Sequence, residues 1–232
     1  MQDLRTTIIL RQHPQRILIN FGLLVIMVSI LLGCAVDRQA ASTPAISPPP
    51  VQQGPAVQRL SDGRRGFTIT EIPQMNEDAR RDFDHAVFLL SHRQYDQAID
   101  LLQKVILQSP GVTAPYINLA IACRYTGKIE QAEAHLKTAL QLVPEHPVAS
   151  NEYGILYRKT GRFTEARAVY EKSLSRFPDY YLLHKNLAIL CDLYLGDWDC
   201  ALEHYEKYSQ AIPEDKQVKA WIADLRLRLD RK

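Results

Sequence analysis

The chain has 232 residues, of which 46% are hydrophobic and 23% are charged, and these shares are ordinary for a globular protein. The formal net charge is +2, and the first 34 residues contain three arginines and one aspartate, so the rest of the chain has equal numbers of basic and acidic side chains. A general nucleic-acid-binding protein would show a basic excess, and the composition therefore argues against that function.

The first 34 residues have the layout of an export signal. Residues 1–16 are polar and basic, Ile17–Leu32 are almost entirely apolar, and Gly33 precedes Cys34. A basic region, an apolar region and a small residue at the cleavage point are typical of a secretory signal peptide. The letters LLGC at residues 31–34 resemble the lipobox of bacterial lipoproteins. The resemblance implies a signal peptide over residues 1–33 and attachment of a lipid such as palmitate to Cys34.

The same segment allows a second interpretation. Ile17–Val36 is 20 residues long, which is sufficient for an uncleaved helix that spans a bilayer. Either interpretation places the remainder outside the cytoplasm, in the bacterial cell envelope. Ala35 follows the cysteine, and by resemblance this favours the outer membrane facing the periplasm. The alternative is an inner-membrane anchor with a periplasmic domain.

Residues 34–75 are expected to form a disordered linker. Proline recurs here among serine, threonine, glutamine and alanine, at Pro44, Pro48, Pro49, Pro50, Pro55 and Pro73. Such a segment cannot bury enough apolar surface to order itself, and its prolines keep it extended. One stretch, Gly66–Ile72, alternates apolar and polar residues as a short strand does. It could cover the exposed face of the first repeat, or it could add a strand to a partner's sheet.

Residues 76–213 repeat themselves with a period of about 34 residues. Small residues recur at positions 8 and 20 of each unit, and proline recurs at position 32. The third unit shows the pattern most clearly, in Tyr153, Gly154, Tyr157, Gly161, Phe163, Ala166, Tyr170 and Pro178. The units cover about residues 79–112, 113–146, 147–180 and 181–215, and the fourth has one extra residue in its turn. This pattern resembles the tetratricopeptide repeat.

The resemblance implies an all-α fold, a right-handed α-solenoid of about four helix hairpins. Small residues at positions 8 and 20 let the two helices of a hairpin approach closely, and glycine supplies the turn between them. One hairpin cannot bury its apolar face alone, so the units must stack. Residues 214–232 are predicted to form a helix that caps the stack.

In the repeat family, the inner surface comes from defined positions of each first helix. Transferred to this chain, these positions predict a groove that mixes amides and basic groups around isoleucines, which suits an extended peptide. The predicted groove residues are Ile117, Asn118, Ile121, Arg124, Tyr125, Asn151, Glu152, Ile155, Arg158, Lys159, Lys185, Asn186, Ile189 and Asp192.

Three cysteines lie within the repeats. Cys191 ends the first helix of the fourth unit and Cys200 begins the second, so a helical hairpin would bring them close to disulfide distance. They could equally be two buried thiols. Cys123 is expected to be a small core residue.

Local signatures of catalysis are absent from the sequence: it has no HExxH, no CxxC, no P-loop and no dinucleotide fingerprint. We therefore expect no enzyme activity, no cofactor, no metal and no small-molecule substrate. The expected function is a membrane-tethered adaptor that binds a protein or peptide, as an accessory or assembly factor of an envelope machine. The alternative is an inner-membrane-anchored structural subunit of an envelope transport or pilus complex.

Overall fold

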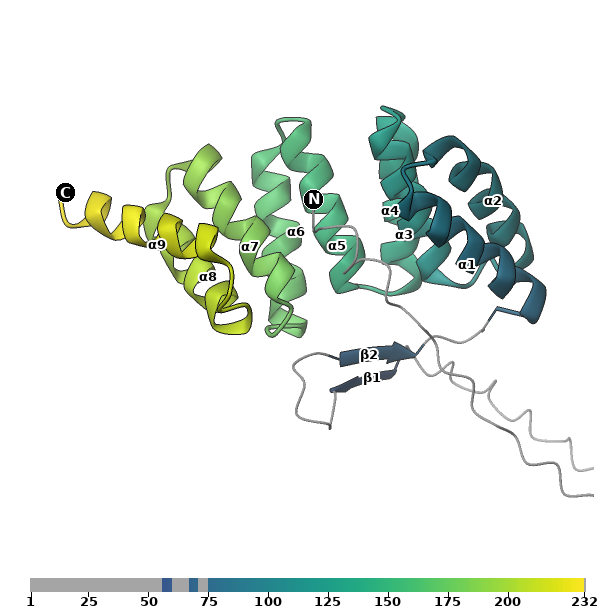
Figure 1. Ribbon diagram of the computed structural model, residues 1–232, viewed down its shortest axis with the longest axis horizontal. Coiled ribbons are helices and arrows are strands. Elements are labelled where there is room, and N and C mark those ends of the chain that lie inside the picture. Colours follow the sequence, from purple (N-terminus) through teal and green to yellow (C-terminus); the bar gives the residue numbers. More distant parts are fainter. Residues whose placement is uncertain (1–55, 60–66, 71–74, 232) are drawn as a thin grey trace, which may run out of the picture. The chain divides into compact units, whose positions relative to one another are not determined.

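The computed structural model describes residues 56–59, 67–70 and 75–231. Cys34 and the whole predicted signal lie outside this range. The described part contains two strands and a series of helices (Figure 1), and no helix in it is long and apolar enough to span a bilayer. The elements are β1 (Ala56–Arg59), β2 (Phe67–Thr70), α1 (Glu77–Ser91), α2 (Tyr95–Gln108), α3 (Thr113–Tyr125), α4 (Ile129–Leu142), α5 (Pro147–Lys159), α6 (Phe163–Arg176), α7 (Tyr181–Leu190), η1 (Cys191–Leu195), α8 (Trp198–Ala211) and α9 (Lys216–Leu229).

The predicted disordered linker contains a β-hairpin, which corrects that prediction for two segments. β1 and β2 pair antiparallel, with Val57 opposite Ile69 and Arg59 opposite Phe67. The alternation over 66–72 correctly indicated a strand, but its partner in the same chain was not recognised. The physical reason is that a short strand satisfies its backbone groups only when paired, and β1 supplies the pairing that composition alone does not reveal.

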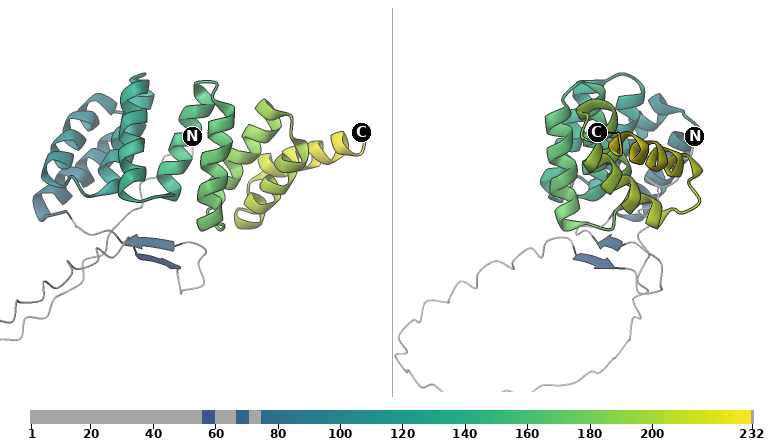
Figure 2. Two further views of the ribbon diagram at one scale, coloured as in Figure 1. Left: turned by 180° about the vertical axis from the view of Figure 1, so that it is seen from behind. Right: turned by 90° about the vertical axis from the view of Figure 1, so that its left-hand side faces the viewer.

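The helices form four hairpins in the predicted order, α1–α2, α3–α4, α5–α6 and α7–α8, followed by α9 (Figures 1 and 2). Each hairpin contacts the next, so the helical part is an α-solenoid. Local chemistry sets the ends of the helices. Asn76 caps α1 by accepting a hydrogen bond from the Ala79 N–H (2.8 Å). α4, α6 and α8 end shortly before Pro144, Pro178 and Pro213, because a residue that precedes proline is pushed out of helical conformation.

The small residues occupy the seam inside each hairpin, as the pattern predicts. Ala120 and Ala132 are buried in the second hairpin, and Ala188 and Ala201 are buried in the fourth. Gly154 is the most constrained, because a Cβ at this residue would lie 2.1 Å from Cε1 of the Tyr170 ring. The ring of Tyr170 therefore packs directly on the glycine backbone.

The turn inside each hairpin closes on the same backbone oxygen, that of position 11. In the second hairpin the Lys128 N–H donates to Cys123 O (2.8 Å), and in the third the Arg162 N–H donates to Tyr157 O (2.8 Å). The closing turn includes a residue in left-handed conformation, as is common at helix C-termini. Gly127 and Gly161 take this conformation, with φ of 79° and 77°, and in the first hairpin Arg93 takes it with φ of 60°.

The fourth hairpin accommodates its extra residue by widening the last turn of the first helix. α7 ends at Leu190, and η1 continues the chain as one turn of π-helix that ends at Gly196, whose φ is 65°. The closing bond from the Asp197 N–H still reaches Cys191 O (3.0 Å), at position 11 as in the other repeats. An insertion of one residue inside a helix is expected to appear as such a π-bulge.

Candidate functional site: the first-helix face

The fourteen predicted groove residues, which we call the first-helix face, come from α3, α5, α7 and η1. α3 contacts α5 and α5 contacts α7, so the residues form one continuous row rather than separate patches. Side chains join the row directly. The Asn186 Nδ2 donates to Asn151 Oδ1 (2.8 Å), which links α7 to α5.

Arg124, one of the predicted groove residues, forms an ion pair between two repeats. Its Nη2 donates to Glu152 Oε2 at 2.9 Å, from α3 to α5. Burial lowers the pKa of the Arg124 guanidinium, but the neighbouring Glu152 carboxylate more than offsets this, and the pKa lies above its ordinary value. Both side chains are nearly buried, with exposed fractions of 14% and 7%. The pair joins two repeats, and its positive charge is already compensated within the chain.

Lys185 and Asp192, two more of the predicted groove residues, are also paired within the chain. Lys185 Nζ lies 3.0 Å from Asp215 Oδ2, and Arg228 Nη1 lies 3.2 Å from Asp192 Oδ1. Asp215 caps α9 and Arg228 lies near its end. The capping helix thus forms ion pairs with the charged groups at the open end of the last repeat, Lys185 and Asp192.

Two cations of the face have no carboxylate partner within the described part of the chain. Arg158 lies over the ring of Tyr194, with 5.8 Å from Cζ to the ring centroid, and Lys159 is exposed. Tyr125 is 47% exposed, and Ile155 and Ile189 are half-buried. These residues remain available to a partner. The remaining members of the face are buried, namely Ile117, Asn118, Ile121 and Asn151 together with Glu152.

Several buried polar atoms on or beside this face lack a hydrogen bond among the described residues. They are Asn118 Oδ1, Arg124 Nε and Ser150 Oγ, from α3 and α5. Asn118 uses its Nδ2 to donate to Ala114 O (2.9 Å), so only its acceptor is unsatisfied. Buried polar groups are nearly always hydrogen-bonded, so these three atoms are exceptions inside the packing of α3 and α5.

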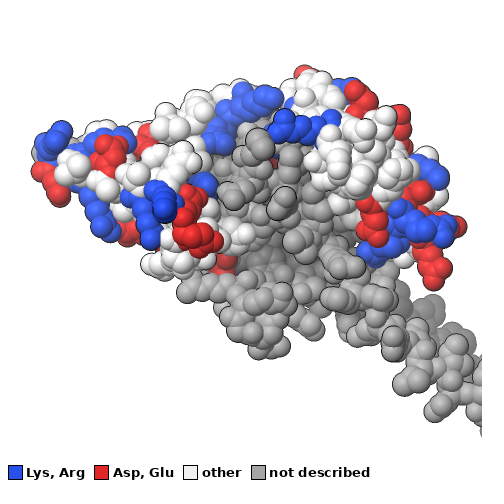
Figure 3. All heavy atoms as spheres, viewed as in Figure 1, with Lys and Arg blue, Asp and Glu red and all other residues white. Residues whose placement is uncertain are grey.

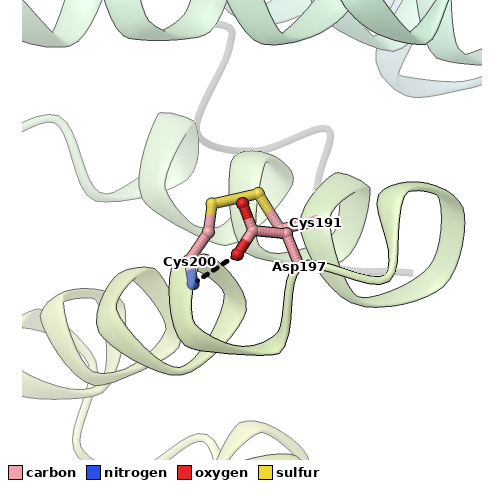
Figure 4. Close-up of side chains that lie close together, drawn as sticks. All are labelled: Cys191, Asp197 and Cys200. Carbon is pink, nitrogen blue, oxygen red and sulfur yellow. Dashed lines mark hydrogen bonds between the residues drawn. A yellow bond between two sulfur atoms is a disulfide. The ribbon is translucent and has the colours of Figure 1, made fainter.

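The cysteines of the fourth hairpin form a disulfide, Cys191–Cys200, with a Cα–Cα distance of 6.0 Å (Figure 4). They occupy positions 11 and 19 of their repeat. The same two positions of the second repeat hold Cys123 and Gln131, whose side chains also meet (Sγ to Oε1, 3.8 Å). The repeat geometry therefore brings these positions together, and residue identity decides whether they bond. Cys123 is a free, buried thiol.

A histidine pair in the same hairpin was missed by the sequence reasoning. His184 Nδ1 and His204 Nδ1 are 2.9 Å apart, and His184 Nε2 lies 2.8 Å from Pro178 O. Burial, followed by the proximity of His184, lowers the pKa of His204 to about 4. Both residues face the α7–α8 seam, as Cys191 and Cys200 do, so their alignment across the hairpin could have revealed the pair.

The charged side chains show no large surface of one sign on the visible side of the described residues. In Figure 3, basic and acidic groups lie interspersed over this side. This distribution agrees with the balanced composition of the chain.

Sequence models of the tetratricopeptide repeat match residues 89–138 and 117–181. The chain is 27% identical over 128 residues to the human protein O-mannosyl-transferase TMTC1, covering 53% of this chain and 13% of that protein. It is 29% identical over 134 residues to the probable UDP-N-acetylglucosamine–peptide N-acetylglucosaminyltransferase SPINDLY of Petunia hybrida, covering 58% of this chain and 14% of that protein. The chain thus spans only a small part of these relatives.

Solved structures share the fold. PilF of Pseudomonas aeruginosa is similar with a TM-score of 0.61 and 19% identity, over 67% of this chain and 70% of PilF. A thermophilic tetratricopeptide-repeat protein of Thermus thermophilus has a TM-score of 0.57 and 23% identity, over 65% of this chain and 82% of its own. The chain therefore contains tetratricopeptide repeats, and its helical part has the fold of a tetratricopeptide-repeat solenoid.

Proposed function

We propose that this protein is a membrane-tethered scaffold of the bacterial envelope that binds a partner protein, or an extended peptide of it, on the first-helix face. The fold is consistent with a protein–protein interaction scaffold and is typically non-catalytic. The observation that carries the proposal is that Arg158 and Lys159, which have no carboxylate partner among the described residues, share this face with the exposed ring of Tyr125. Cations beside an accessible aromatic ring suit a segment that carries a carboxylate.

The partner segment that fits this face is extended and carries an acidic side chain. Arg158 and Lys159 supply cations that no described carboxylate compensates, and the half-buried Ile155 and Ile189 supply apolar contact. Arg124 contributes differently, because its charge is compensated by Glu152 and both side chains are nearly buried.

The tether rests on residues outside the described range. The signal-like segment and Cys34 support attachment to the outer membrane through a lipid, and residues 35–55 would act as a spacer. In this role the protein would be an accessory or assembly factor of an envelope machine. The second candidate, an inner-membrane-anchored structural subunit of a transport or pilus complex, is favoured only by the length of the apolar run Ile17–Val36.

Binding on the first-helix face is tested by crosslinking the tethered protein in intact envelopes and identifying what co-purifies. Arg158→Ala with Lys159→Ala should reduce recovery of the partner at least about tenfold, because a pair of charge-assisted hydrogen bonds is lost. The unfolding temperature should change little, since neither side chain has an ion pair among the described residues.

The matched control removes the same charge from second helices, through Lys137→Ala with Lys172→Ala. This variant should recover the partner as the parent does. If the control loses the partner and the Arg158 variant keeps it, the binding surface lies on the second helices and the proposal is wrong.

A further inference from the structure

Three metal-ligating side chains meet at the turn of the fourth hairpin. Cys191 Sγ, Cys200 Sγ and a carboxylate oxygen of Asp197 all lie within 4.8 Å of one another, and Figure 4 shows the carboxylate beside the two sulfur atoms. Within the described part of the chain, this is the only group of three such residues. The widened turn η1 keeps Asp197 at the place beside position 11 that Lys128 takes in the second hairpin, since the Asp197 N–H donates to Cys191 O as the Lys128 N–H donates to Cys123 O.

We propose that the reduced form of this cluster is a zinc-binding site, with Cys191, Cys200 and Asp197 as its protein ligands. Two thiolates and one carboxylate are a donor set that Zn²⁺ accepts, and water would complete a tetrahedron. Zinc–sulfur bonds of about 2.3 Å and zinc–oxygen bonds of about 2.0–2.2 Å place tetrahedral ligand atoms roughly 3.5 Å apart. In the present structure the two sulfur atoms are bonded to each other. To reach the zinc geometry they need only move apart once this bond is broken.

The cluster lies at the N-terminus of α8. Asp197 is the N-cap of α8, and Cys200 lies in the first turn of that helix, where the helix dipole stabilises a negative charge. Arg167 Nη1 donates to Asp197 Oδ2 at 3.0 Å. The Cys200 N–H donates to the other carboxylate oxygen, Asp197 Oδ1, at 3.2 Å, so two hydrogen bonds hold the carboxylate in place beside the sulfur atoms. Arg167 also pairs with Glu171 (Nε to Oε1, 2.7 Å), so it is shared between two carboxylates.

The second hairpin shows why the site is confined to the fourth. It presents Cys123 and Gln131 at the equivalent positions and Lys128 where Asp197 stands. An amide, one thiol and an ammonium group do not bind zinc.

The disulfide and the zinc site are mutually exclusive states of the same atoms. A dithiol such as dithiothreitol would supply two electrons and two protons, breaking the Cys191–Cys200 bond and forming its own cyclic disulfide. Zinc binding then releases the two thiol protons to solvent. Zinc would therefore stabilise the reduced form, and free zinc at about 100 times its Kd would shift the thiol–disulfide equilibrium about a hundredfold, which is about 59 mV.

The test uses the full chain, purified in mild detergent, with Cys34→Ser and Cys123→Ser to remove the other thiols. The protein is reduced with dithiothreitol, desalted under nitrogen and checked for helix content by circular dichroism. It is then titrated with zinc against a chromophoric chelator. We expect one zinc per reduced chain and none per oxidised chain. Cobalt in place of zinc should give the near-ultraviolet charge-transfer band of thiolate ligation.

Two carboxylate variants complete the test. Asp197→Asn retains a helix-capping side chain but loses the charged ligand, and it should weaken zinc binding at least about tenfold. Asp199→Asn removes a carboxylate two residues away, outside the cluster, and should bind zinc as the parent does. The proposal is overturned if the reduced parent takes up no more zinc than Cys191→Ser, if Asp197→Asn binds zinc as tightly as the parent, or if uptake occurs only after helix content is lost.

Discussion

At the scale of single residues, the structure assigns most of the charged groups of the first-helix face to contacts within the chain. Arg124 holds Glu152 across two repeats, and Lys185 holds Asp215 across the boundary with the capping helix. The repeat pattern located these residues on one face but could not reveal their partners, because the partners lie about one repeat away in sequence. Position in a repeat determines the direction of a side chain, and its neighbours determine what the side chain binds.

His146 should make stability sensitive to acid. It is fully buried at the start of α5, where its Nδ1 accepts a hydrogen bond from the Ala149 N–H (3.3 Å), and burial lowers its pKa to about 4. The unfolded chain binds this proton near pH ~6.5 and the folded chain only near pH ~4. Lowering the pH through this window therefore favours the unfolded state, by up to about 3 kcal/mol from this residue.

The variant His146→Asn keeps a capping oxygen and does not titrate. Urea unfolding from about pH 7.5 to about pH 4 should show a shallower loss of stability below about pH 6.5 than in the parent. Above about pH 7 the two proteins should respond to pH alike, which serves as the internal control. Equal slopes over the acidic range would mean that His146 is protonated in the folded protein.

At the scale of elements, the four hairpins differ mainly at their turns. Gly127, Gly161 and Gly196 provide left-handed conformation at low cost, whereas the first hairpin places Arg93 there. The sequence indicated that the first unit is the most divergent, because its turn has no glycine. The structure adds that the backbone keeps the same turn and that Arg93 bears the conformational cost.

Arg93→Gly should stabilise the protein by about 0.5–1 kcal/mol, because relief of the left-handed strain exceeds the flexibility that glycine adds to the unfolded chain. The measurement is the shift of the urea midpoint. Gly127→Ala is the matched converse, since a Cβ there meets no atom within 4 Å and only the backbone conformation opposes it. It should destabilise by about 1 kcal/mol. A destabilised Arg93→Gly protein would show that the arginine side chain makes a contact that outweighs its strain.

At the scale of the whole molecule, the proposal of a tethered scaffold joins two parts of the chain with different support. The solenoid is a described structure with related solved folds, whereas the tether is inferred from residues 1–55 alone. The two parts can be tested separately, because the tether determines where the protein lies in the cell and the solenoid determines what it binds.

Labelling of growing bacteria with radioactive palmitate should label the parent protein and leave Cys34→Ala unlabelled. The chain of Cys34→Ala should also retain its N-terminal segment, since cleavage of a lipoprotein signal depends on the modified cysteine. Cys123→Ala provides the control for loss of a cysteine as such, and it should label fully. A parent protein that is never labelled and keeps its intact N-terminus would support the inner-membrane anchor instead.

The sequence by itself determined the periodic features of this protein, namely its class, its four hairpins, their approximate boundaries and the residues at each seam. These follow from local chemistry and a repeated spacing, in which small residues permit close approach and prolines end helices. Only the tertiary structure decided what depends on contacts between units. It shows the pairing of β1 with β2, the Arg124–Glu152 and Lys185–Asp215 pairs, and the proximity of Asp197 to Cys191 and Cys200. The physical reason is that burial, charge pairing and ligand geometry depend on atoms that are distant in sequence, and periodicity does not specify where those atoms meet.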